Sequence, residues 1–140
     1  MQPRGVELRM VRFGTSGWRG IIGREVTFRR VRMVVQAVIE TLREEERPVD
    51  RVVVGFDTRL LSEKFAVAAA RLVASNGIRA ELVPRDVPSP VISSMVLERS
   101  AAAGLTFTGS HNAPEYGGLK IYTSDGILAP DDFTNRVEHR

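Results

Sequence analysis

The chain has 140 residues, a size usual for one domain, and 43% of them are hydrophobic and 26% charged. This composition is that of a globular protein and excludes a disordered one. The net charge is only +3, and the few aromatic residues do not interleave with basic ones as in a nucleic-acid platform. The sequence has no cysteine, which excludes disulfides and thiol chemistry.

No apolar run reaches the roughly 20 residues that a membrane span needs, and the N-terminus lacks a signal-peptide pattern. We therefore expect a cytoplasmic protein that binds neither nucleic acid nor membranes. A mildly basic domain of this kind can still attract a phosphorylated metabolite.

Apolar periodicity predicts three helices in chain order. The first covers about residues 28–46 and follows a candidate cap at Thr27. The second begins after Ser62 and ends at Asn76-Gly77, where glycine allows a left-handed stop. The third is short and begins at Ser89-Pro90.

Short β-rich segments alternate with these helices, at residues 51–56, 79–83, 104–108 and 119–123. Alternating strands and helices predict a parallel sheet covered on both faces, and the three consecutive valines of the first segment suit its centre. The last segment follows its predecessor after only a loop, which allows antiparallel pairing. We expect an α/β fold, a three-layer α/β/α domain with a mostly parallel, mixed, four-stranded sheet.

No linker or repeat divides the sequence, so residues 1–140 are treated as one domain. Pro130, Asp131 and Asp132 near the C-terminus are typical of the first turn of a helix. This pattern predicts that the chain is a fragment of a larger protein.

In an α/β sheet, ligands bind beyond the carboxyl ends of the strands. The loop at residues 109–118 follows a predicted strand and mixes small, polar and turn residues around Ser110. A serine can carry a phosphoryl group where cations and backbone N–H groups neutralise the charge. Composition alone nevertheless favours an ordinary surface turn, in which Ser110 and Asn112 bond their own backbone.

Two other interpretations of this loop are weaker. Ser110 and His111 could form a hydrolase pair, but triad partners are seldom adjacent in sequence and the G-x-S-x-G elbow is missing. His111 and Glu115 have the four-residue spacing of metal ligands on a helix, but Pro114 argues against a helix there.

Three basic residues are candidates for the same site. Lys120 is predicted to lie on the strand face opposite the core, as a solvated lysine or as a cation beside the loop. Arg19 lies among glycines 14, 17 and 20, which suggest a tight phosphate-approaching loop. Asp57 and Arg59 are expected to form an ion pair that fixes a strand end.

Together these segments resemble the α-D-phosphohexomutase superfamily, the phosphoglucomutase/phosphomannomutase type, in its first domain. The four segments that carry the resemblance occur in the family's order: FGTSGWRG at 13–20, GFDTR at 55–59, VPSPVIS at 87–93 and TGSHNAPEYGGLKIY at 108–122. The last of these is the most specific. It departs from the family where Ala113 replaces a proline and where Gly118 or Gly117 replaces an asparagine.

The resemblance implies that Ser110 is the phosphoserine of a hexose 1-phosphate/hexose 6-phosphate mutase that works through a bisphosphate intermediate. It implies that His111 and Asn112 order the loop, and that Arg19 and Lys120 flank the reacting oxygens as charge stabilisers or proton-transfer groups. The remaining residues of the phosphate-binding loops would be Thr15, Ser16 and Arg59.

The resemblance also implies Mg²⁺, bound partly by the phosphate on Ser110. The other metal ligands and the sugar contacts would lie in further domains of the same enzyme, so the isolated chain would be nearly inactive. Two alternatives remain open: a non-catalytic phosphosugar or anion-binding module, and a small hydrolase that uses Ser110. The hydrolase would be labelled by a serine-directed phosphonate.

Family members usually begin two or three residues before F-G-T, so residues 1–9 are predicted to be an N-terminal extension and Met10 the true start. Removing residues 1–9 is expected to leave the melting temperature unchanged, because terminal residues outside a core add little to stability. Thermal unfolding of the shortened chain measures this, and a large loss would refute the extension.

Overall fold

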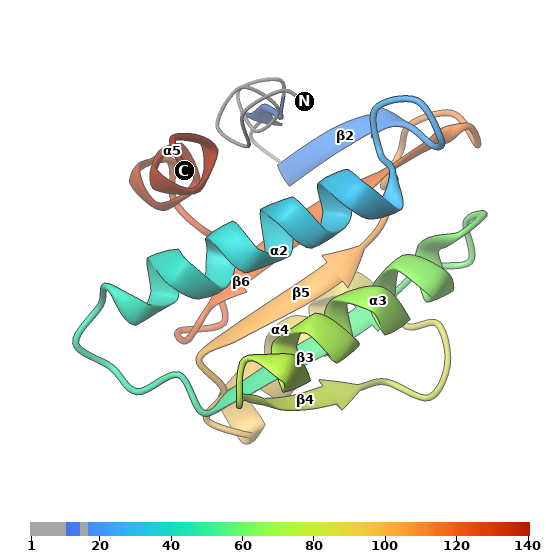
Figure 1. The fold of residues 1–140 in the computed structure, drawn as a ribbon. Helices are drawn as coiled ribbons and strands as arrows, with labels where there is room; N and C mark the ends of the chain where they lie inside the picture. The colour runs from blue at the N-terminus through green and yellow to red at the C-terminus, as the bar shows by residue number, and fades with distance from the viewer. Residues whose placement is uncertain (1–10, 15–16) are drawn as a thin grey trace.

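A computed structural model describes residues 11–14 and 17–140 (Figure 1). The predicted extension and the candidate residues Thr15 and Ser16 lie outside these residues. In the described part, no helix is both long and apolar enough to cross a membrane.

The described residues form a mixed six-stranded sheet in the order β1-β2-β6-β5-β3-β4. The strands are β1 Phe13–Gly14, β2 Gly17–Ile21, β3 Arg51–Phe56, β4 Arg79–Leu82, β5 Ala103–Phe107 and β6 Tyr116–Thr123. Strand β3 pairs in parallel with β4 and β5, while β6 is antiparallel to β5 and β2. The α/β class, the four predicted strands and the antiparallel pairing are therefore confirmed.

The predicted strand number of four was wrong, because two further strands come from the N-terminal stretch that was interpreted as a glycine-rich loop. Gly17 has a φ of 96°, and a Cβ there would lie 2.4 Å from the carbonyl oxygen of Leu119. Glycine thus lets β2 approach β6 closely. Trp18, opposite Leu119, is only 3% exposed, so β2 also adds an apolar side chain to the core.

Four helices cover the described sheet: α2 Phe28–Arg43, α3 Ser62–Ser75, α4 Ser89–Glu98 and α5 Asp131–Glu138. Helix α2 begins as predicted, with the Thr27 hydroxyl accepting a hydrogen bond from the Arg30 N–H at 3.2 Å. It ends three residues early, because the apolar stripe stops at Leu42 and the residues after it are exposed. Gly77 terminates α3 with a φ of 78°, which confirms the left-handed stop.

The helices form two layers around the sheet. Helices α2 and α3 lie over one face with α5 beside α2, and α4 lies behind the opposite face (Figure 1). The rings of Phe28 and Phe65 join α2 to α3 at 4.8 Å between centroids. Strand β3 is covered from both sides, so that Val52, Val53 and Val54 are at most 1% exposed.

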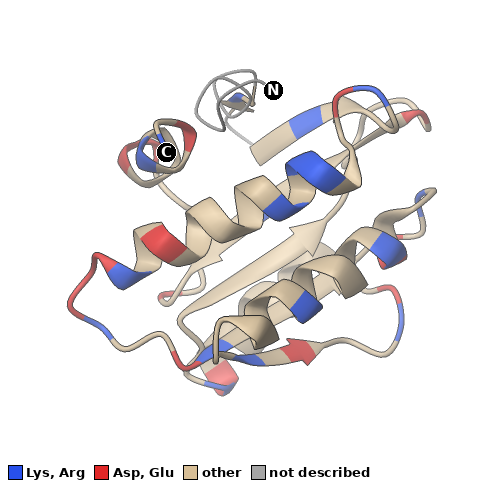
Figure 2. Ribbon diagram, viewed as in Figure 1, with Lys and Arg blue, Asp and Glu red and all other residues tan. Residues whose placement is uncertain are grey.

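Charged residues lie mainly on the helices and the connecting segments, and the central strand β5 carries none (Figure 2). A sheet covered on both faces buries its inner strands, and buried strands rarely carry charged residues. Within the sheet, the charged side chains therefore belong to strands other than β5.

Gly55→Ala is expected to destabilise the domain by about 2 kcal/mol, because overpacking forces neighbours out of position. The added Cβ would lie 2.3 Å from Cδ1 of Ile92 in α4. Urea unfolding measures the loss, and adding Ile92→Val should restore part of it. The matched control is Gly14→Ala, whose Cβ would meet nothing closer than 3.8 Å. Equal losses at both glycines would contradict this packing.

Candidate functional site

The loop that contains Ser110 lies at the carboxyl ends of β3 and β5. Phe56 pairs with Phe107 at the ends of these strands, and the Asp57 N–H donates to the Phe107 carbonyl at 3.0 Å. The N–H of Val87, just before α4, donates to the Phe56 carbonyl at the same edge. Because β6 is antiparallel to β5, it begins here as well. Three of the four motif segments therefore meet at the edge where α/β proteins bind ligands.

Ser110 has a left-handed backbone conformation, with a φ of 54°. Its N–H donates to the hydroxyl of Thr108 at 2.9 Å, as in a serine/threonine turn. A non-glycine residue in this region is strained by roughly 1–2 kcal/mol, and such strain persists only where the surroundings maintain it. The side chain is half-buried, with the exposed residues His111 and Asn112 following it.

Asp57 connects the end of β3 to this loop through its carboxylate. One oxygen accepts the N–H of Gly109 at 3.2 Å, and the other accepts the Arg59 N–H at 2.9 Å and the Ser62 hydroxyl at 2.8 Å. The predicted ion pair with Arg59 is present, at 3.5 Å between Nε and Oδ2. The sequence reasoning missed Thr108 and Ser62, although hydroxyl residues at a turn and at a helix start are common capping positions.

Arg59 was predicted among the phosphate-loop residues, and the structure places its guanidinium against the backbone of the Ser110 loop. It donates to the carbonyl oxygens of Ser110, Asn112, Ala113 and Tyr116, at 2.6–3.2 Å. A Cβ on Gly109 would lie 2.5 Å from this guanidinium. Glycine at this position therefore leaves the space that the arginine occupies.

Arg19 and Lys120 lie on the sheet face of α4. Leu119 and Ile121 are buried on the other face, as predicted, which leaves Lys120 partly exposed. Arg19 pairs with Gly118 in the β2–β6 register, so its side chain emerges on the same face as that of Lys120. Nη1 of Arg19 donates to the Trp18 carbonyl at 2.8 Å, while Nη2 is buried with no hydrogen-bond partner among the described residues.

The electrostatics of this face favour an anion. Burial lowers the pKa of Arg19, and repulsion from Arg59 lowers it further. Burial also lowers the pKa of Lys120, with a smaller contribution from Arg19. Asp57 and Tyr122 act in the opposite direction on Arg19 without cancelling the shift, and a bound phosphate would stabilise both cationic forms.

The structure thus brings Ser110, Arg59 and Arg19 together at one edge with Lys120 on the adjoining strand face. His111 and Asn112 lie on the exposed part of the loop, and Asn112 takes part through its N–H, which donates to the Gly109 carbonyl at 3.0 Å. No hydrogen bond joins the Ser110 hydroxyl to an imidazole in the described part. Nor do three or more histidines and carboxylates converge within residues 11–14 and 17–140.

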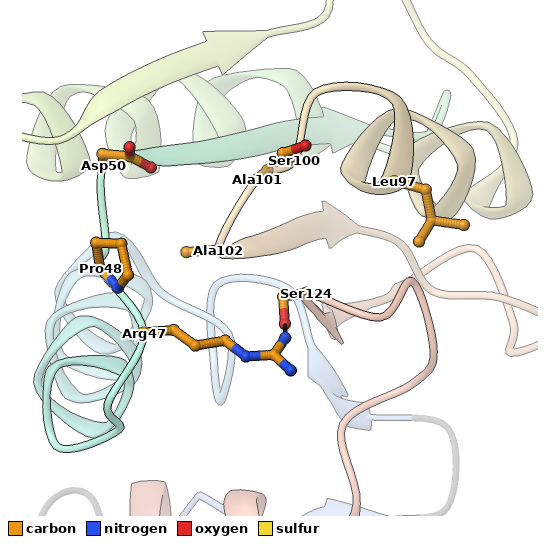
Figure 3. A pocket seen from close by; sticks show the side chains of 8 residues that line it. All are labelled: Arg47, Pro48, Asp50, Leu97, Ser100, Ala101, Ala102 and Ser124. Carbon is orange, nitrogen blue, oxygen red and sulfur yellow. Dashed lines mark hydrogen bonds between the residues drawn. The ribbon is translucent and has the colours of Figure 1, made fainter.

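A hollow of about 320 Å³ lies at the opposite, amino-terminal edge of the sheet (Figure 3). Its lining includes Pro48 and Asp50 before β3, Ala102 before β5 and Ser124 after β6. Arg47 points across this hollow to the hydroxyl of Ser124 and lies 3.6 Å from Asp125. Its charge is already paired, so the hollow lacks the uncompensated cations of the Ser110 edge.

The site is thus a strained serine loop near cations at the carboxyl edge of an α/β/α sandwich, and sequence comparison identifies the family. Residues 10–140 match the family model described as phosphoglucomutase/phosphomannomutase, alpha/beta/alpha domain I. The chain therefore belongs to the phosphoglucomutase/phosphomannomutase family, as the motifs predicted.

Named relatives agree with this assignment. The chain is 32% identical to a phosphoglucosamine mutase of Ruminiclostridium cellulolyticum over 90% of its own length and 28% of the relative's. It is 30% identical to a phosphoglucomutase of Staphylococcus haemolyticus, over 97% and 25% of the two chains. The chain thus spans only about a quarter of the length of these relatives.

Solved structures show the same fold. A crystal structure from Thermus thermophilus, of a protein assigned as a phosphomannomutase, superposes with a TM-score of 0.86 at 38% identity, over 91% of this chain and 29% of the other. The open form of a Paramecium phosphoglucomutase, parafusin, superposes with a TM-score of 0.79 at 26% identity, over 91% and 24% of the two chains.

Replacing Arg19 with glutamine is expected to raise the pKa of Lys120 towards its ordinary value, because Arg19 is one of the two causes that lower it. NMR titration of the lysine side chains measures this shift. Arg43→Gln, which removes an arginine at the far end of α2, is the control and should leave Lys120 unchanged. An unaltered Lys120 titration in the Arg19 variant would contradict the proximity of the two cations.

Proposed function

We propose that this chain is domain I, the phosphoserine-carrying domain, of a phosphohexomutase that interconverts hexose 1-phosphate and hexose 6-phosphate. The observation that carries the proposal is Ser110, held in a left-handed conformation at the carboxyl edge of the sheet and flanked by cations that lack sufficient compensating charge. Membership of the family supports the same reaction class.

In the proposed reaction, the phosphoryl group on Ser110 Oγ passes to the free hydroxyl of a hexose monophosphate. The bond from phosphorus to Oγ breaks, a bond to the sugar oxygen forms, and the hydroxyl proton leaves to a base. The departing Ser110 Oγ takes up a proton, which it gives back when it is phosphorylated again. The bisphosphate then reorients and returns its other phosphoryl group to Ser110. No net atom is gained or lost, which is what an isomerisation requires.

The chain's own residues supply charge and position for this transfer, the two things that phosphoryl transfer needs most. Arg19 offers its Nη2, which has no hydrogen-bond partner among the described residues, to the oxygens of the moving group. Lys120, with its lowered pKa, exchanges a proton more readily than an ordinary lysine and is suited to act at the sugar hydroxyl. By the family resemblance, we propose that His111 and Asn112 order the loop and that Thr15 and Ser16 bind phosphate.

The proposal includes Mg²⁺, held partly by the phosphate on Ser110. Both carboxylate oxygens of Asp57 already accept hydrogen bonds, and the described residues form no cluster of three or more acidic or imidazole groups. Among the described residues, only the phosphate on Ser110 is therefore proposed as a ligand of the metal ion. We propose that the remaining ligands belong to other domains of the enzyme. A bound magnesium ion would neutralise the charge that develops on the transferring oxygens.

Ser110→Ala in the complete enzyme that contains this chain is expected to lower kcat by at least about 10³-fold, because no other group replaces a lost nucleophile. A coupled assay with hexose 1-phosphate measures the activity. Mass spectrometry after incubation with a hexose bisphosphate should detect one added phosphoryl group on the unaltered protein only. Ser75→Ala, on the exposed end of α3, is the matched control, and full activity of the Ser110 variant would refute the phosphoserine.

A second candidate function is a non-catalytic module that binds a phosphosugar or another anion. The buried Nη2 of Arg19, which has no partner in residues 11–14 and 17–140, favours it, since an anion would satisfy this group without any reaction. Calorimetry with a hexose phosphate separates the two functions. Binding by an unaltered complete protein that transfers no phosphoryl group would favour the module.

A further inference from the structure

Arg59 makes an unusual set of contacts with a single loop. Its Nη2 donates to the carbonyl oxygens of Ser110 at 2.7 Å and Asn112 at 2.6 Å, and its Nη1 donates to those of Ala113 at 2.6 Å and Tyr116 at 3.2 Å. A guanidinium has five N–H groups in a planar fork, and these bonds use the four on its terminal nitrogens. The fifth, on Nε, faces the carboxylate of Asp57 at 3.5 Å. No donor of Arg59 is left for a substrate.

These bonds determine the path of the loop. Carbonyl dipoles from four residues converge on one point, which would be repulsive without a cation at their centre. Three of the four carbonyls belong to residues 110–113, so the chain must curl around the guanidinium within a single turn. The left-handed conformation of Ser110 turns its carbonyl inward to Arg59 while its N–H donates to Thr108.

Arg59 is itself held from the end of β3. Its own N–H donates to the Asp57 carboxylate, which also accepts the N–H of Gly109 just before Ser110. Gly109 leaves the space for the guanidinium, because a Cβ there would meet its Cζ and Nε at 2.5 Å. The loop is therefore tied on both sides of Ser110 to one rigid, buried strand.

We propose that Arg59 is a positioning residue that maintains the strained conformation of Ser110, rather than a ligand of the substrate phosphate. The conformational part stands on geometry alone, and its importance for catalysis rests on the proposed phosphoserine. Arg59 thereby acts through Ser110: it fixes the direction of the serine side chain before any phosphate is present, so that the transfer needs no reorganisation of the loop.

The first test is a double-mutant cycle in the 140-residue chain. In the unaltered background, Ser110→Gly should melt about 4 °C higher than Ser110→Ala, because only glycine adopts a positive φ without strain. In an Arg59→Ala background the two Ser110 variants should melt at the same temperature, since nothing would then impose that conformation. The proposal would be overturned if the full difference in melting temperature persisted in the Arg59→Ala background. It would also be overturned if the unaltered background showed no difference.

Two further variants keep this cycle interpretable. Arg43→Ala removes another arginine that donates to a backbone carbonyl, that of Asn76 at 2.6 Å, and should leave the glycine–alanine difference intact. Arg59→Lys retains the charge but cannot span four carbonyls, so it should reduce the difference. If neither Arg59 variant folds, the unaltered chain is tested instead. NMR couplings should then be detected across the hydrogen bonds from Arg59 to the Ser110 and Asn112 carbonyls, and absence of these couplings would refute the contacts.

The second test separates positioning from substrate binding in the complete enzyme. Arg59→Lys should lower kcat by about 10²-fold and leave KM for the hexose phosphate unchanged, because a misplaced nucleophile slows the transfer without weakening binding. A raised KM with an unchanged kcat would make Arg59 a phosphate ligand and overturn the proposal. If instead Ser110→Ala kept full activity, the phosphoserine would fail while the melting-temperature cycle still tested the conformation.

Discussion

The carboxylate of Asp57 is the group on which the arrangement of the site depends. It accepts hydrogen bonds from Gly109, Arg59 and Ser62, and so joins the end of β3, the start of α3 and the loop after β5. Each bond satisfies a polar group at a place where the main chain leaves regular structure. With Arg59 anchored in this way, a loop of small and polar residues acquires one defined path, and Ser110 acquires a strained conformation that its own preferences would not select.

The sheet explains why the cations lie where they do. Helix α4 covers the β3 and β5 part of one face, where Gly55 and Gly104 leave room for Ile92 and Val96. Arg19 and Lys120 belong to β2 and β6 on the same face, beyond this helix. They are buried enough to have lowered pKa values, yet Lys120 remains partly exposed. A phosphate arriving at this face would meet positive charge that no acidic side chain has fully neutralised.

Family membership and the geometry of the site establish different properties of this domain. The family model and the relatives show what kind of domain this is, and that the relatives are roughly three to four times as long. The geometry of residues 57–59 and 108–116 adds which motif residues support the backbone of the serine loop. Motif matching does not contain this information. Two of the matched motifs, GFDTR and TGSHN, are in direct contact, so that the first supports the backbone of the second. Motif residues can therefore be structural partners of a nucleophile rather than substrate contacts.

The sequence alone was sufficient for the class of fold, the helices, the strands β3 to β6 and the family, because these depend on local periodicity, capping residues and short motifs. It could not show that residues 13–14 and 17–21 form strands, since Gly17 serves a close approach to β6 that is visible only once both strands are placed. It predicted the Asp57–Arg59 pair but not the four carbonyls that Arg59 binds. Those partners lie more than 50 residues away in sequence. Every residue has a backbone carbonyl, so the amino-acid sequence does not indicate which carbonyls accept these bonds. Tertiary structure alone brings them together, because only the parallel pairing of β3 with β5 places the two strand ends side by side.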